Sequence, residues 1–234
     1  MALTARDSLS TEHVSKQIGV IVCSQRKPRA GLQIGTFVLD SLKQYQRSHP
    51  SSQPAEIILI DLADHPLPLY DEPGIPSQIH SSSGYTHAHT RAWSDLINSF
   101  AAFVFVTPQY NWGCPASIKN AIDYLYHEWT GKPAMVVSYG GHGGGKAAAQ
   151  LKEVLHGLRM KVVPNHVELA FPGRDFLVKA AGGADLGLRV VDDNGNDNDN
   201  DNGTQETVWA KEAADIHKAF EDLLGLLAGQ GSEA

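Results

Sequence analysis

The stretch Ile18-Gly-Val-Ile-Val-Cys23, followed by Ser24-Gln-Arg-Lys-Pro-Arg-Ala-Gly31, determines the architecture expected for this chain. Its first part is a continuous apolar run bounded by polar residues, which is typical of a parallel strand buried on both faces. Its second part is a polar, basic loop. A helical pattern from about Leu32 to Tyr45 follows, with apolar positions spaced to form one face. The stretch therefore predicts a buried strand, a loop and a covering helix.

The same alternation continues along the chain. Further strands are expected at Ile57–Ile60, Phe103–Val106, Ala134–Val137 and Val162–Leu169. Further helices are expected at Tyr85–Ser99, Ser117–Tyr126, Lys146–Leu158 and Thr207–Leu227. Apolar strands that alternate with helices predict an α/β fold with a parallel sheet and helices on both faces. Five strands joined by right-handed crossovers favour the flavodoxin-like, doubly wound order over the six-strand dinucleotide fold.

Three segments fall outside this pattern. Residues 1–16 are expected to form a disordered leader, so that a single domain spans 17–230. The proline-rich segment His65–Pro76 cannot be a helix or an inner strand, and we expect a long ordered loop over the top of the sheet. Ala180–Thr207 contains the Asp/Asn-rich tract Asp192–Gly203, which has few side chains that favour ordering and lacks the spacing of a calcium loop. We expect a disordered surface insertion there.

Composition narrows the functional classes. The chain has 234 residues and is 42% apolar, which suits one domain with a buried core. No stretch is long enough for a membrane span and Met1–Lys16 lacks the layout of a signal peptide, so we expect a cytoplasmic protein without a membrane partner. The net charge is −7, but five acids lie in Asp192–Gly203, and no basic cluster suggests nucleic-acid binding. Cys23 and Cys114 indicate free thiols, and no Cys/His spacing predicts a metal site.

Three unusual loops are expected at one edge of the sheet. In an open α/β sheet, ligands bind at the C-terminal ends of the strands, where the strand order reverses. In the flavodoxin-like order that point lies between the first and third strands, which lead into Ser24–Gly31 and Thr107–Pro115. The glycine cluster Gly140–Gly145 follows the fourth strand, close by in the same crevice. This convergence predicts a ligand site.

The first loop has the chemistry of a phosphate site. Helix N-termini bind anions, Ser24 supplies a hydroxyl, and Arg26 can fork two phosphate oxygens, with Lys27 and Arg29 adding positive charge. A solvated basic loop is the alternative. The chain lacks both GxGxxG and GxxxxGK[ST] at this position, which argues against a Rossmann dinucleotide site and a nucleotide triphosphatase.

The second and third loops suit a flat heterocycle. Tyr110 and Trp112 offer faces for a planar ring, and Gln109 and Asn111 can hydrogen-bond its edge, although the aromatic rings could simply pack the loop onto the sheet. The glycine cluster lets backbone approach a ligand closely. His142 is a candidate proton donor or an ordinary surface residue.

Two motifs make a family resemblance specific. Thr107-Pro-Gln-Tyr-Asn-Trp-Gly-Cys-Pro-Ala-Ser-Ile-Lys-Asn-Ala-Ile-Asp123 resembles the signature of the NADPH-dependent FMN reductase family, and Ser138-Tyr-Gly-Gly-His-Gly-Gly144 resembles its second flavin loop. The combination looks closest to the small NAD(P)H:quinone reductases, over about Ile18 to Leu169. The resemblance implies FMN as cofactor, NADPH or NADH as co-substrate, and a homodimer or homotetramer.

The resemblance also implies roles for individual residues. Ser24 and Arg26 match positions that hold the FMN phosphate. The positions that lie along the flavin ring match Pro108, Gln109, Tyr110, Asn111 and Trp112. Those near its pyrimidine edge match Ser138, Tyr139, Gly140 and Gly141. Tyr139 and His142 are candidate polar groups near the acceptor. The family often has Ser or Thr where this chain has Arg29, so either Arg29 replaces that hydroxyl contact to the phosphate or another group supplies it.

The implied reaction is a ping-pong reduction. NAD(P)H passes hydride to the flavin and leaves, and a small quinone-like acceptor then takes its place, so no protein nucleophile is needed. Cys114 precedes a helix start, where a thiolate would be favoured, with a plain buried thiol as the alternative. Other candidate functions are a reductase of free flavin, azo dyes or metal oxyanions, a flavodoxin-like electron carrier, and a flavin-binding scaffold without turnover.

Overall fold

The computed structural model describes residues 15–51, 54–190 and 208–229. At its centre is a sheet whose neighbouring strands follow the order β2-β1-β3-β4-β5, with β6 also paired to β4. The strands are β1 (Gln17–Val22), β2 (Glu56–Asp61), β3 (Ala102–Pro108), β4 (Pro133–Gly140), β5 (Lys161–Val162) and β6 (Val167–Ala170). All of these pairings are parallel. The order confirms the predicted flavodoxin-like, doubly wound sheet.

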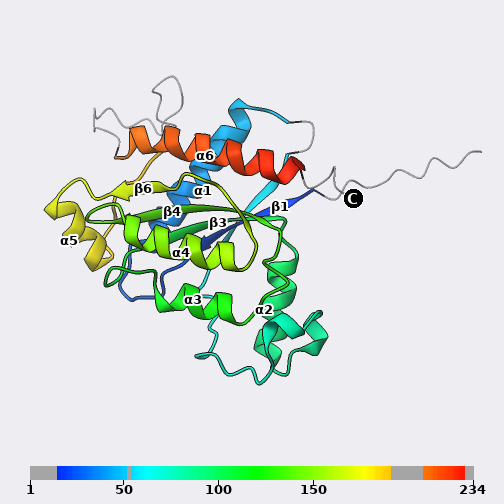
Figure 1. Cartoon of the computed structure of the whole chain (residues 1–234). Helices are drawn as coiled ribbons and strands as arrows, with labels where there is room; N and C mark the ends of the chain where they lie inside the picture. Colours follow the sequence, from blue (N-terminus) through cyan, green and yellow to red (C-terminus); the bar gives the residue numbers. More distant parts are fainter. Residues whose placement is uncertain (1–14, 52–53, 191–207, 230–234) are drawn as a thin grey trace, which may run out of the picture.

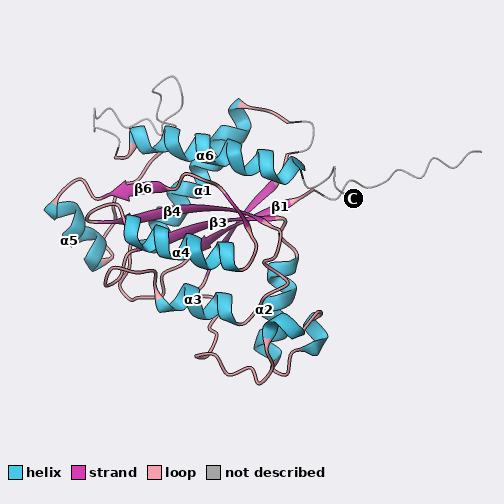
Figure 2. Cartoon of the chain, in the orientation of Figure 1, coloured by secondary structure: helices cyan, strands magenta, loops and turns pink. Residues whose placement is uncertain are grey.

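Helices cover both faces of this sheet, as predicted. They are α1 (Gly31–Ser48), α2 (Ala88–Asn98), α3 (Ala116–Asp123), α4 (Gly145–Gly157), α5 (Arg174–Gly182) and α6 (Ala210–Gly229), with short 3-10 turns η1 (Pro76–Gln78) and η2 (Ser82–Gly84). Helices α1 and α6 lie on one face, and α2, α3 and α4 lie on the other (Figures 1 and 2). Within the described ranges, no helix combines the length and apolarity needed to cross a membrane.

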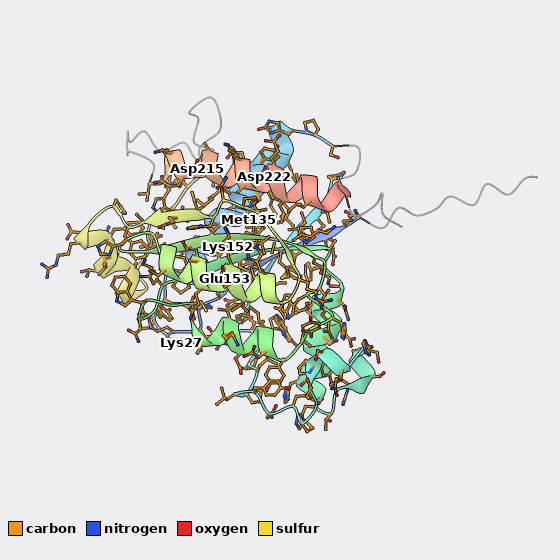
Figure 3. All side chains as sticks on the ribbon, in the orientation of Figure 1. Lys27, Met135, Lys152, Glu153, Asp215 and Asp222 are labelled. Atoms are coloured by element: carbon orange, nitrogen blue, oxygen red, sulfur yellow. The ribbon has the colours of Figure 1, made fainter. Side chains whose placement is uncertain are left out.

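The strands are apolar throughout because each has a core on both sides. Side chains alternate between the faces of a strand, so Val104 packs in the core beneath α1 and α6, and its neighbour Phe103 packs beneath the other helices. Figure 3 shows Met135 in the middle of the sheet, with Asp222 on α6 and Glu153 on α4 on opposite outer sides. Polar residues therefore face away from the sheet on both helical layers.

The prediction of one strand over Val162–Leu169 is wrong. The chain forms β5 and β6 instead, with a break that contains Pro164. Between the two paired stretches β4 advances three residues, from Ala134 to Val137, while the edge chain advances five. The extra residues bulge out of the ladder, and Pro164 has no N–H to donate to it.

Two loop predictions also need correction. The segment after β2 does not lie over the top of the sheet, since it packs against α3 instead: the Tyr124 hydroxyl and the Asn120 amide both donate hydrogen bonds to the Pro68 carbonyl. The expected insertion begins inside ordered structure, because α5 extends to Gly182 and Leu186 is buried. The Asp192–Gly203 tract lies outside the described residues, as does most of the expected leader.

Candidate functional site

Three loops meet at the C-terminal edge of the sheet, at the left of Figure 1. Val22 of β1 is in register with Val106 of β3, and Pro108 of β3 is in register with Tyr139 of β4. The loops that follow these strands therefore start side by side, as predicted from the strand order. Lys27, labelled in Figure 3, lies in the first loop on this side of the molecule.

In the first loop, Ser24 is fully buried at the beginning of α1. Its Oγ atom makes no hydrogen bond of acceptable geometry with any group in the described part of the chain. A Cβ on Gly31, the first residue of α1, would lie 2.0 Å from that oxygen and 2.7 Å from the Tyr139 hydroxyl, so only glycine fits there. A buried hydroxyl of this kind beside a helix N-terminus fits the phosphate of FMN.

Arg29 does not take the place of the hydroxyl expected at its position. Its guanidinium donates two hydrogen bonds to the Asp61 carboxylate at the end of β2, one of them 2.8 Å long, and another to the Ser24 carbonyl. Burial alone would raise the pKa of Asp61, but hydrogen bonds from Arg29 and the Ala63 N–H, with the Arg29 charge, outweigh it and lower that pKa. Arg29 is thus held inside the protein.

Arg26 remains at the surface of the same loop. Its guanidinium carbon lies 5.3 Å from the centre of the Tyr110 ring, a cation–π arrangement that joins the first loop to the second. The structure therefore brings together two of the predicted residues, Arg26 and Tyr110, from loops that are far apart in the sequence.

The second loop forms a tight turn with unusual backbone angles. Tyr110 and Gly113 exchange two backbone hydrogen bonds, and the residues between them, Asn111 and Trp112, have φ of 48° and 68°. A tryptophan in the left-handed region costs roughly 1–2 kcal/mol. Trp112 is also 76% exposed, so its large ring gains little from packing. A strained, exposed aromatic residue beside a ligand loop suits a binding role.

Two glutamines hold this turn onto α4. The Gln109 side-chain oxygen accepts hydrogen bonds from the backbone N–H groups of Lys146 and Ala147, so it caps α4 and is not available to a heterocycle edge. The Gln150 side-chain oxygen accepts the Cys114 N–H at 2.8 Å. Gln150 lies in the middle of a helix, and nothing in the sequence indicated this contact. Burial raises the pKa of the Cys114 thiol, which disfavours the thiolate considered above.

The third loop is built from glycines and closed by Ser138. The buried Ser138 hydroxyl donates a hydrogen bond to the Gly143 carbonyl at 2.8 Å, so this side chain supports the loop from beneath and does not face a ligand. Gly144 has φ of 86°, and a Cβ there would lie 2.9 Å from the Tyr139 carbonyl oxygen. Gly140 and Gly141 lie at the accessible rim of the loop, where their backbone can approach a cofactor.

Tyr139 is 4% exposed, and its hydroxyl lies beside Ser24. Burial raises the pKa of the phenol well above its ordinary value, and the nearby Ser24 hydroxyl opposes this only in part. Its ring also stacks on Phe171. The Tyr139 hydroxyl therefore lies at the floor of the first loop, and its role as a polar group near the acceptor stays a prediction.

An open hollow of about 540 Å³ adjoins the second and third loops. It is lined by Gln109, Trp112, His142, Gly145, Lys146, Ala149 and Glu168. Lys146 and His142 are exposed there, and Glu168 Oε1 accepts a hydrogen bond from His166 Nε2 at 2.9 Å. Of the two catalytic candidates, only His142 therefore borders open space.

Helix α5, which the sequence did not predict, lies beside the third loop. The Cδ1 atom of Leu177 lies 3.3 Å from the point where Gly141 would carry a Cβ, and Leu177 is 44% exposed. Behind α5, the Gln33 side chain of α1 bonds to both the Ala184 carbonyl and the Leu186 N–H. The segment after α5 is therefore fixed to the first turn of α1, at this edge of the sheet.

Comparison with known proteins agrees with this architecture. Residues 17–172 match the model of the NADPH-dependent FMN reductase family. An NAD(P)H-dependent FMN reductase of Saccharomyces cerevisiae is 49% identical over 149 residues, covering 63% of this chain and 77% of that protein. Another, from a Nectria species, is 37% identical over 214 residues, covering 90% and 96%.

More distant relatives extend the comparison. A quinone reductase of Escherichia coli is 31% identical over 118 residues, covering 47% of this chain and 58% of that protein. The solved structure of a flavoenzyme NAD(P)H:(acceptor) oxidoreductase from Paracoccus denitrificans shares the fold, with a TM-score of 0.57 at 19% identity and coverage of 92% and 98%. The chain belongs to the NADPH-dependent FMN reductase family, and it is an oxidoreductase that uses FMN with NAD(P)H as electron donor.

Proposed function

We propose that this enzyme is an NAD(P)H:quinone reductase that binds FMN across the three loops. The observation that carries the proposal is the fully buried Ser24 hydroxyl beside the first turn of α1, which makes no hydrogen bond of good geometry within the described residues. A phosphate group would accept hydrogen bonds from this hydroxyl and from the first N–H groups of the helix, and its charge would interact favourably with the helix dipole.

Residues of the other loops complete the proposed cofactor site. Arg26 lies at the surface over Tyr110, where its guanidinium can contact phosphate oxygens. The turn Tyr110–Gly113 would lie along the flavin ring, and the backbone of Gly140 and Gly141 would approach its pyrimidine edge. When bound, FMN supplies the redox chemistry, accepting hydride from NAD(P)H and delivering electrons to the acceptor.

The proposed acceptor is a small, flat, quinone-like molecule. Support comes from the exposed Trp112 ring and from the open hollow of about 540 Å³ beside it, which suits one ring system at a time. The nicotinamide would then leave before the acceptor enters, which is the ping-pong order. His142 borders the hollow and is the candidate proton donor to an acceptor oxygen.

Spectroscopy and kinetics test this proposal. The purified protein is saturated with FMN, mixed with NADPH without oxygen, and then mixed with a quinone. We expect bleaching by NADPH, rapid recovery with quinone, and parallel lines in double-reciprocal plots. Bleaching without recovery would identify an electron carrier. Faster turnover with added free FMN than with quinone would favour free-flavin reduction, the alternative supported by the names of the nearer relatives.

The phosphate contact is tested separately with Arg26→Ala. We expect FMN affinity to fall by about tenfold, because a charged hydrogen bond contributes about 1.5–3 kcal/mol. Arg47→Ala is the matched control, since Arg47 is an exposed arginine in the last turn of α1, at the far end from the proposed phosphate site. Equal FMN affinity in both variants would remove Arg26 from the site.

A homodimer or homotetramer is also part of the proposal. Large apolar side chains are exposed at Leu69, Ile75 and Val178, at 86%, 60% and 61%, and subunit contact would cover them. Sedimentation analysis of the FMN-loaded protein measures the assembly, and a monomer at micromolar concentration would contradict it. The cytoplasmic location stays a prediction, which imaging of a tagged chain would test.

A further inference from the structure

A nearly buried ion pair joins the first loop to the end of β2. The Arg29 and Asp61 side chains are 13% and 7% exposed, and the guanidinium contacts both carboxylate oxygens. Asp61 Oδ1 also accepts the Ala63 N–H at 2.9 Å, which fixes the carboxylate on its own side. The pair therefore ties residues 32 positions apart into one rigid unit.

The same guanidinium holds Ser24. One of its nitrogens, Nη1, donates to the Ser24 carbonyl as well as to Asp61. The Ser24 backbone is thereby set from one side while its hydroxyl faces the start of α1, beside Gly31. Since no described side chain caps α1 at Ala30, the hydroxyl and the first turn of the helix are both left for an outside acceptor.

The pair is poorly suited to bind a phosphate directly. Arg29 has two of its outer nitrogens engaged with Asp61, and the carboxylate cancels most of its charge at a distance. Swinging Arg29 towards a ligand would leave Asp61 buried without its cation, which is strongly unfavourable. Its geometry suits a support for the loop better than a ligand contact.

We propose that Arg29 and Asp61 are positioning residues that set Ser24 and the first turn of α1 for the FMN phosphate, and so make the enzyme select FMN over riboflavin. The proposal rests on the placement of that phosphate at Ser24–Gly31 given above. It goes further in assigning the unexpected arginine of this loop to support, and in assigning a role to a residue at the end of β2 that no motif indicated.

The test compares binding of FMN and riboflavin to the flavin-free protein, followed by flavin fluorescence. Asp61→Asn keeps the shape of the side chain and removes its charge. We expect the Kd for FMN to rise about tenfold or more while the Kd for riboflavin changes less than about threefold, because only the phosphate contacts lose their alignment. Asp123→Asn is the control, since it breaks the exposed Lys119–Asp123 pair and should change neither value.

Other outcomes would overturn the proposal. Tighter FMN binding by Asp61→Asn would mean that Asp61 restrains Arg29 from a phosphate contact of its own. Equal weakening of both flavins would mean a general structural role, and no change would mean no role. Arg29→Lys keeps the positive charge but cannot bond both carboxylate oxygens of Asp61 at once. If Asp61→Asn does not fold, this second variant should show the same selective loss of FMN affinity.

One further variant separates this proposal from the one on which it rests. Ser24→Ala should also weaken FMN selectively. If Ser24→Ala leaves the Kd for FMN unchanged, the phosphate lies elsewhere and the proposed cofactor site is wrong. If Ser24→Ala has the expected effect and Asp61→Asn does not, the site is supported and only the positioning role fails.

Discussion

Replacing Gly31 with alanine tests the packing of the phosphate loop. The new Cβ would lie 2.0 Å from the Ser24 hydroxyl oxygen and 2.7 Å from the Tyr139 hydroxyl oxygen. Both side chains are buried, at 0% and 4% exposed, so neither can turn into solvent. The oxygen of Ser24 must then retreat by more than an ångström into a filled core, or the start of α1 must move away from β1.

The size of the effect follows from these contacts. Overpacking costs about 1–3 kcal/mol, and each kcal/mol lowers the Tm of a chain this size by roughly 2–4 °C, so we expect a fall of roughly 2–12 °C. FMN affinity should fall by about tenfold or more, because the displaced hydroxyl loses a charged hydrogen bond of about 1.5–3 kcal/mol. Calorimetry of the flavin-free protein measures the first effect, and flavin fluorescence the second.

Gly225→Ala is the control for this substitution. Gly225 is exposed inside α6, and its Cβ would meet no described atom within 4 Å, so alanine should stabilise the protein by about 0.5–1 kcal/mol. Adding Ser24→Ala to Gly31→Ala should recover part of the lost Tm, since it removes the nearest clash. A Gly31→Ala protein with unchanged Tm and FMN affinity would refute the reasoning.

Three more substitutions address other parts of the molecule. Trp112→Gly should raise the Tm of the flavin-free protein by roughly 2–4 °C, because it relieves about 1 kcal/mol of strain from the left-handed backbone. Steady-state kinetics should show a lower kcat/KM for quinone, and an unchanged kcat/KM would exclude a binding role for Trp112. Leu177→Ser should raise the KM for an apolar quinone about threefold or more without changing FMN affinity, since it removes about 1 kcal/mol of apolar contact beside Gly141. An equal rise in the KM for ferricyanide, which is not apolar, would contradict an apolar contact between Leu177 and the quinone. Burial lowers the pKa of Lys132 to about 8, although nearby Glu128 opposes the shift. Above this pH the unfolded chain still binds the proton that the folded chain has lost, so the free energy of unfolding of the wild type rises with pH. Urea unfolding at pH 7.5 and 9.5 should therefore show the wild type gaining about 2 kcal/mol relative to Lys132→Met, and a constant difference would contradict the shift.

The pattern of apolar runs was sufficient to predict most of the fold. Residues such as Val104 and Phe103 alternate between two cores, and only a strand buried on both faces favours an uninterrupted apolar run. The prediction failed at the sheet edge, where Pro164 interrupts the last strand. It also missed α5, where within the described structure Ala180 alone is fully buried, so the helix has almost no apolar periodicity to detect.

The candidate site shows a similar division. The sequence located the three loops, because the strand order alone determines which loops meet, and the motif at 107–123 identified the family. It could not assign the side chains within the loops. Gln109, Ser138 and Tyr139 match motif positions, yet their polar atoms are turned toward α4, Gly143 and Ser24.

The layers, the strand order and the edge of the sheet where the loops meet could thus be predicted from the sequence, since these depend on periodicity and on chain connectivity. The pairing of Arg29 with Asp61 and the burial of the Ser24 hydroxyl beside Gly31 became visible only in the folded chain. These contacts could not be predicted, because a charged or polar side chain is directed by partners that are distant in sequence. Those partners become neighbours only when β1 and β2 lie side by side in the sheet.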